Sequence, residues 1–77
     1  MMLTAKANIE FEIEELIEDR ETITLCRTND IHKVIEVCDL LEGDFNVTVW
    51  IDNVLYGVYQ DPNIGELYDI FISISKY

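Results

Sequence analysis

Basic residues are scarce in this chain. Its 77 residues include five lysines and arginines against sixteen aspartates and glutamates, which gives a formal net charge of -11. Nucleic acids and anionic lipid surfaces are polyanions, so this charge argues against direct binding to either one. Basic protein surfaces and cations are the counterparts that it favours. A purely solubilising role is the competing interpretation of the same charge.

Cysteine, glycine and proline are also few, at two, three and one residues. Two cysteines, Cys26 and Cys38, are fewer than the disulfide framework of a small secreted domain usually needs. Residues 1–8 show no signal-peptide pattern, and no apolar run approaches the roughly 18 residues of a membrane span. We therefore expect a cytoplasmic protein whose two cysteines are reduced core residues.

Hydrophobic residues, by contrast, make up 49% of the chain. A disordered acidic segment would lack this apolar content. No linker and no internal repeat is visible in the sequence. A single small domain over residues 1–77, with its charge carried on the surface, is the expectation.

The first half of the chain predicts a hairpin followed by a helix. Residues 3–14 alternate between apolar and polar side chains, as a half-buried strand does, although a helix from about Asn8 competes. Residues 21–27 alternate again and form the second arm. A helix then begins after a cap at Asn29 or Asp30 and stops at Gly43. Its apolar face consists of Ile31, Val34, Ile35, Cys38 and Leu41.

A second hairpin follows, with Asp52 and Asn53 as its two-residue turn, because both residue types tolerate positive φ. This loop length pairs Ile51 with Val54, Val49 with Tyr56, and Val47 with Val58 on one face. The other face then carries Trp50 opposite Leu55, and Asn46 opposite Tyr59.

The segment 61–65 is expected to form a turn, and residues 67–75 a last strand. The predicted order is β-β-α-β-β-β. The expected fold is therefore a two-layer α+β domain in which one amphipathic helix packs on a mainly antiparallel sheet. The other face of that sheet would be open to water or to a partner.

Nothing in the sequence assembles a catalytic or metal site. The lone His32 stands beside Asp30 without a nucleophile placed for it, so a surface histidine is expected. The run Asp61, Asn63, Gly65, Glu66 has the wrong spacing for a calcium loop, and no His/Cys set suits zinc. We expect no enzymatic activity, no cofactor and no metal.

An acidic cluster near the start of the chain is the first candidate binding surface. It consists of Glu10, Glu12, Glu14, Glu15, Glu18, Asp19 and Glu21. On a strand, alternate residues stand about 6.6–6.8 Å apart on one face. Evenly spaced negative charge on a rigid frame can imitate a phosphate backbone and attract a basic nucleic-acid groove. The competing interpretation is a solvated strand face that discourages aggregation.

A set of apolar residues on the open sheet face is the second candidate. Trp50, Leu55 and Tyr59 would form an exposed patch of the kind that anchors interfaces. Alternatively, Phe71 and the curvature of the sheet would cover them as a second small core.

In size and charge the chain resembles the small acidic anti-defence proteins of phages and mobile elements, the anti-restriction and anti-CRISPR inhibitors. No sequence motif carries this resemblance. It implies a non-enzymatic inhibitor that binds a basic nucleic-acid-handling protein by charge mimicry. The alternative is a small assembly module that dimerises or joins a complex through its open sheet face.

Overall fold

The computed structural model describes residues 7–18 and 21–75 and contains four strands and two helices. The elements follow the order β1 (Ile9–Leu16), β2 (Thr22–Thr28), α1 (Ile31–Leu40), β3 (Phe45–Ile51), β4 (Val54–Gln60) and α2 (Ile64–Ile74). All strand pairs are antiparallel, and the sheet order is β2-β1-β3-β4. The α+β class and the antiparallel sheet agree with the prediction from the sequence.

The first hairpin joins β1 and β2. The predicted strand is confirmed from Ile9 onward, whereas Ala7 and Asn8 precede it. Residues 3–6, its expected first part, lie outside the described residues. Pairing shifts between Ile13 and Glu14: Ile13 faces Cys26 while Glu14 faces Thr24, so Leu25 is an extra residue. This bulge bends the edge strand and increases its twist.

Helix α1 begins where the sequence indicates. Asp30 is the N-cap, and its Oδ1 accepts a 2.9 Å hydrogen bond from the backbone N–H of His32. The helix ends at Leu40, before the predicted stop at Gly43, with Leu41 as an extended C-cap. Ile31, Val34 and Cys38 are buried, as the three- and four-residue spacing predicts.

The second hairpin has the predicted turn. Asp52 and Asn53 adopt positive φ values of 52° and 64°, which suits the twist of a two-residue hairpin loop. The pairs Ile51–Val54 and Trp50–Leu55 are confirmed.

Beyond those two pairs the predicted register is wrong. A shift between Val49 and Trp50 places Gly57 opposite Val49 and leaves Tyr56 as the extra residue. Val58 therefore faces Thr48, Tyr59 faces Val47, and Gln60 faces Asn46. A Cβ at residue 57 would lie 3.1 Å from the Tyr59 Oη, so the tyrosine ring occupies the space beside this glycine.

The segment predicted as a last strand is instead the helix α2, which corrects the order to β-β-α-β-β-α. Asn63 caps it: its Oδ1 accepts from the Glu66 N–H at 2.8 Å, while Glu66 Oε1 accepts from the Asn63 N–H at 3.1 Å. This reciprocal capping box is readable as Asn-x-x-Glu in the sequence. The isoleucines of the segment favour strands, and the capping and core packing override that preference.

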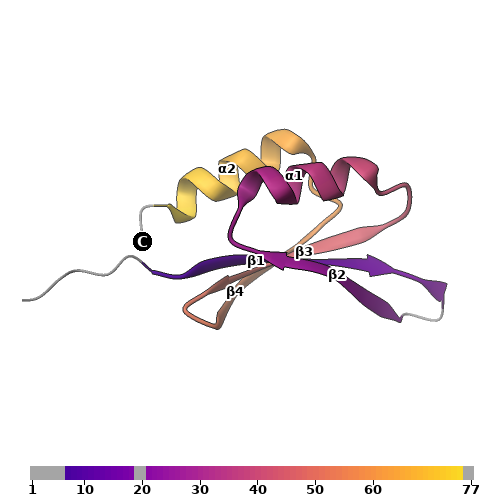
Figure 1. Cartoon of the computed structure of the whole chain (residues 1–77), viewed down its shortest axis with the longest axis horizontal. Helices are drawn as coiled ribbons and strands as arrows, with labels where there is room; N and C mark the ends of the chain where they lie inside the picture. Colours follow the sequence, from indigo (N-terminus) through magenta and orange to yellow (C-terminus); the bar gives the residue numbers. More distant parts are fainter. Residues whose placement is uncertain (1–6, 19–20, 76–77) are drawn as a thin grey trace, which may run out of the picture.

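Both helices cover the same face of the sheet (Figure 1). One helix was predicted in that layer, and α2 is the second. The buried core between the layers consists of Phe11, Ile13, Ile31, Val34, Cys38, Phe45, Val47, Val49, Leu67 and Ile74. The opposite face of the sheet, called the open face below, is covered by no element of the described chain.

Candidate functional site

Three glutamates form a row along the open face. Glu10, Glu12 and Glu14 alternate along β1, which is an inner strand of the sheet, and each is half-buried. They alternate with the core residues Phe11 and Ile13, which point toward the helices. The predicted common face of these three carboxylates is therefore present, and it is called the glutamate row below.

Hydrogen bonds from both neighbouring strands hold two carboxylates of the row, those of Glu12 and Glu14. Glu12 accepts from the Trp50 Nε1 at 3.0 Å and from the Thr24 Oγ1 at 3.2 Å. Glu14 accepts from the Thr22 Oγ1 at 3.3 Å and from the Thr48 Oγ1 at 3.5 Å. Donors fix the position of these carboxylates without cancelling their charge.

Glu10 differs because a cation stands beside it. Arg27 Nη2 lies 3.1 Å from the Glu10 Oε1, and the guanidinium carbon lies 4.9 Å from the centroid of the Trp50 ring. The same Nη2 donates to the Asn53 Oδ1 at 3.3 Å. An arginine stacked on an aromatic ring and paired with a carboxylate is held in place by both contacts. The charge of Glu10 is therefore balanced within the protein.

The other predicted acidic residues lie elsewhere. Glu15 pairs with Phe45 and so faces the helix side of the sheet, while Glu18 and Glu21 are exposed at the end of the first hairpin. The Glu21 N–H donates to the Glu18 carbonyl at 3.4 Å, so the backbone of these two residues lies close together. Asp19 lies outside the described residues. The six described residues of the cluster therefore divide into the row, the hairpin end and Glu15.

The predicted apolar patch needs one correction. Trp50 and Leu55 pair on the open face as expected, whereas Tyr59 packs against the core on the helix side. The bulge at Tyr56 reverses the facing of every later residue of β4. Val58 takes the expected place of Tyr59 and is 54% exposed. Gly57, in mid-strand, is the sequence signal that could have indicated this bulge.

Histidine, cysteine and clustered acidic side chains are the groups that could bind a metal or take part in catalysis. Over residues 7–18 and 21–75, no group of three or more His, Cys, Asp or Glu side chains could hold a metal ion. His32 is exposed at the start of α1. Cys26 and Cys38 are free, and burial raises the pKa of the Cys38 thiol to about 11, with the nearby Cys26 adding to the rise. A thiol with that pKa stays protonated and unreactive at neutral pH.

Neither described helix is long and apolar enough to cross a membrane. Comparison of the chain with protein-family models, with curated proteins and with solved structures finds no match in any of the three. The side chains themselves are therefore the basis for inferring a function.

Proposed function

We propose that this protein is a non-enzymatic inhibitor that presents a fixed acidic surface to a basic, nucleic-acid-handling protein. The observation that carries the proposal is the glutamate row, in which Glu12 and Glu14 are held by donors from both neighbouring strands. Pre-positioned carboxylates lose little conformational entropy when a basic groove binds them. Their spacing along one strand supports imitation of a phosphate backbone.

The charge balance of the described residues supports the same proposal. Fifteen of the sixteen acidic residues lie in residues 7–18 and 21–75, where Arg27 and Lys33 are the only lysine or arginine residues. Both already stand beside a carboxylate, Arg27 with Glu10 at 3.1 Å and Lys33 with Glu36 at 3.6 Å. The remaining carboxylates have few internal cations to balance them and favour an external one.

The biological setting of the proposal is that of the anti-restriction and anti-CRISPR proteins of phages and mobile elements, acting in the cytoplasm. There, an acidic inhibitor would occupy the groove that its target uses for DNA or RNA. Direct binding of nucleic acid by this chain has no part in the proposal, because like charges repel.

The test is affinity capture from a bacterial lysate with the immobilised protein, followed by elution with duplex DNA. A mimic's target should be released by DNA and by raised salt, because both compete for its basic groove. The double variant Glu12→Gln and Glu14→Gln should lose the captured protein, while Glu36→Gln, on α1, should retain it. Charge mimicry would be contradicted if neither DNA nor salt released the captured protein, or if the double variant still captured it.

A second function is supported by the apolar part of the open face. Leu55 and Val58 are each 54% exposed on that side of the edge strand β4, which suits an assembly module that pairs through this face. A substitution of Trp50 would not distinguish the two functions, because the Trp50 Nε1 also donates a hydrogen bond to Glu12. Leu55→Ser separates them: it should weaken self-association in sedimentation experiments and leave DNA-sensitive capture unchanged.

A further inference from the structure

The helix layer carries a second surface, on the opposite side of the sheet from the glutamate row. Ile64, Tyr68 and Ile72 of α2 are 47%, 40% and 58% exposed. These three residues, together with the cavity that the first turn of α2 forms with the end of α1, are the surface called the interhelical groove here. Large apolar side chains exposed in one stripe are typical of interaction sites.

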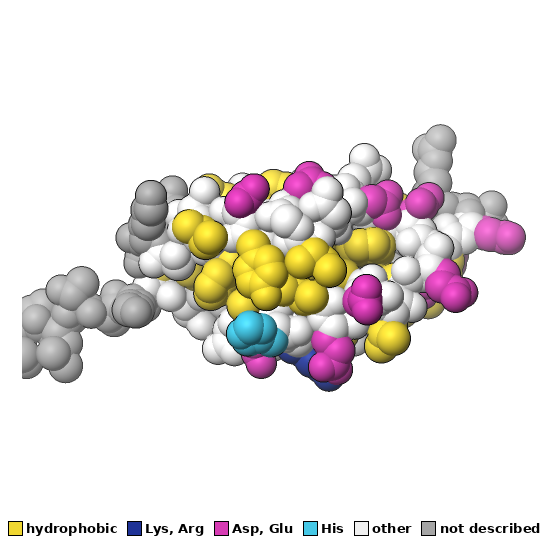
Figure 2. All heavy atoms as spheres, turned by 90° about the horizontal axis from the view of Figure 1, so that it is seen from above, with side chains coloured by type: hydrophobic (Ala, Val, Ile, Leu, Met, Phe, Trp, Pro, Cys, Tyr) yellow, Lys and Arg dark blue, Asp and Glu magenta, His cyan; other side chains and the backbone are white. Residues whose placement is uncertain are grey.

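The stripe begins on the flank of α2 that faces α1. Ile64 lines a cavity together with Cys38 and Asp39 of α1, and residues four and eight positions later continue along the same side of a helix. The other flank is turned to β4, since Ile70 and Ser73 line a separate, smaller cavity with residues of that strand. Figure 2 shows the hydrophobic side chains gathered in a band along the helix layer.

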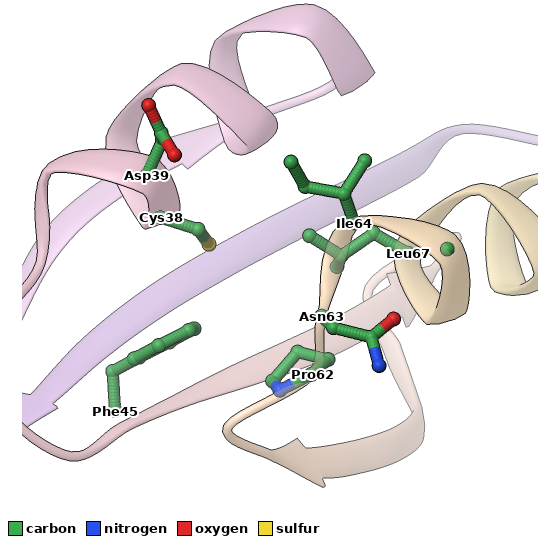
Figure 3. Close-up of a pocket in the computed structure, with 8 residues that line it drawn as sticks. Cys38, Asp39, Phe45, Pro62, Asn63, Ile64 and Leu67 are labelled. Carbon is green, nitrogen blue, oxygen red and sulfur yellow. The ribbon is translucent and has the colours of Figure 1, made fainter.

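The cavity at one end of the band has a volume of about 510 Å³. Figure 3 shows Cys38 and Asp39 from α1, Phe45 from β3, and Ile64 and Leu67 from α2 around it. Its polar side chains are few, and the Asn63 Oδ1 is already engaged by the Glu66 N–H. A small-molecule site usually has several convergent polar groups, so this cavity is better suited to an apolar side chain of a protein partner.

Acidic side chains lie along both long sides of the band (Figure 2). The two helices contain Glu36, Asp39, Glu66 and Asp69, and Lys33 is their one lysine or arginine, paired with Glu36. A second copy of this chain would bring the same acidic rim against the first and be repelled. An anionic membrane would be repelled as well. The charge complementarity therefore favours a basic partner with an apolar centre.

We propose that the interhelical groove binds an amphipathic helix of a partner protein, one whose apolar face is flanked by lysines and arginines. The stripe from Ile64 to Ile72 spans about 12 Å, which is the length of roughly two helical turns of a partner. Apolar anchors at i, i+4 and i+7 would match it, and one anchor would enter the cavity. This surface goes beyond the proposed function, because the groove and the glutamate row face away from each other.

The test uses three synthetic helical peptides, each about four turns long. The first has leucines on one face flanked by lysines. The second has the same composition with its leucines scattered, and the third has glutamates in place of the lysines. Calorimetry should show that the first binds about tenfold or more tightly than the second, since only it can dock an apolar face. The third should not bind.

Variants on the two faces form the matched control. Ile72→Ser should weaken binding of the first peptide several-fold, whereas Leu55→Ser, at a similarly exposed position of the open face, should leave it unchanged. Tyr68→Ser provides a second variant, and thermal melting checks that each variant is folded. Amide shifts in NMR spectra should fall on α1, α2 and the cavity residues.

The single tryptophan separates this proposal from the proposed function. Trp50 lies on the open face, so its emission should stay unchanged when the peptide binds the groove. Equal binding of the scattered peptide, an unaffected Ile72→Ser variant, or shifts confined to the strands would each overturn the groove proposal. None of these outcomes would contradict the proposed function, because that function is tested by capturing a protein through Glu12 and Glu14 and releasing it with DNA.

Discussion

The two halves of this chain follow one structural plan with different surface chemistry. Each half is a hairpin followed by a helix, β1-β2-α1 and then β3-β4-α2, and the first strands of the two hairpins pair at the centre of the sheet. Each hairpin has a bulge at the corresponding place, after Ile13 in one and after Val49 in the other. Each helix begins at a side-chain cap, Asp30 or Asn63.

The difference lies on the open face. There β1 presents Glu10, Glu12 and Glu14, whereas β3 presents Asn46, Thr48 and Trp50. The inward positions of the same strands are apolar in both halves, with the exception of Glu15 at the end of β1. Packing against the helices therefore constrains one side of each strand, while the outward side is free to differ. In this molecule the outward donors of β3 hold the acceptors of β1.

The largest expected effect is at the inward positions, where both halves pack against the helices. Ile13→Ala should lower the free energy of unfolding by about 2–5 kcal/mol, because it leaves a cavity at a fully buried site. Val58→Ala, on the outward side of β4, should stay within about 0.5 kcal/mol of the parent protein. Urea denaturation followed by Trp50 fluorescence measures both. Equal losses would mean that the open face is buried by something else.

The second prediction uses the buried thiol of the first half. Because folding raises the pKa of Cys38 to about 11, the folded state retains its proton longer than the unfolded state. This contribution to stability is complete below about pH 9 and is lost as pH rises through 11, a change of up to about 3 kcal/mol. Cys38→Ala should be less stable at neutral pH but lack this alkaline loss. If the free energy of unfolding of the two proteins changed with pH in the same way, the loss would not come from Cys38.

The third prediction concerns the two-residue turn of the second hairpin. Asn53→Ala should cost about 1–2 kcal/mol, since alanine is strained at the φ of 64° found there. Asn53→Gly adopts this φ without strain and should be close to neutral. Both variants lose the contact with Arg27. The difference between their melting temperatures therefore reports the backbone strain at residue 53 alone.

The smallest expected effect concerns the acidic charge of the first hairpin. Glu18→Gln and Glu21→Gln should each raise stability by a few tenths of a kcal/mol, because repulsion is relieved at the acidic end of the first hairpin. Raising the salt concentration should stabilise the parent protein and reduce the advantage of these variants. Glu36→Gln, which removes the partner of Lys33, should bring no gain. A flat response of the melting curve to salt would show that the carboxylates do not repel one another.

Local signals predicted much of the fold. The period-two alternation located both hairpins, the Asp52-Asn53 pair fixed the second turn, and Asp30 marked the start of α1. The missed helix α2 shows where local reasoning fails. Its isoleucines alternate as well as repeat at helical spacing, and the capping box at Asn63 was the deciding signal.

The candidate site was predictable in part. Alternation alone placed Glu10, Glu12 and Glu14 together, but it could not pair Arg27 with Glu10, because that contact depends on strand order and register. The bulge at Tyr56 moved Tyr59 to the core and Val58 to the open face. A one-residue insertion in a strand reverses every later side chain, so a single missed bulge changes the predicted surface.

By itself, the sequence determined which residues alternate, where the chain turns, and that the surface carries a large negative charge. Those properties depend on neighbouring residues and on composition. Only the tertiary structure decided that β1 lies between β2 and β3, so that donors from both sides hold its carboxylates. It also decided that the two helices share one face of the sheet and form the cavity between Cys38 and Ile64. Such contacts join residues far apart in the chain, and packing of the whole core selects them.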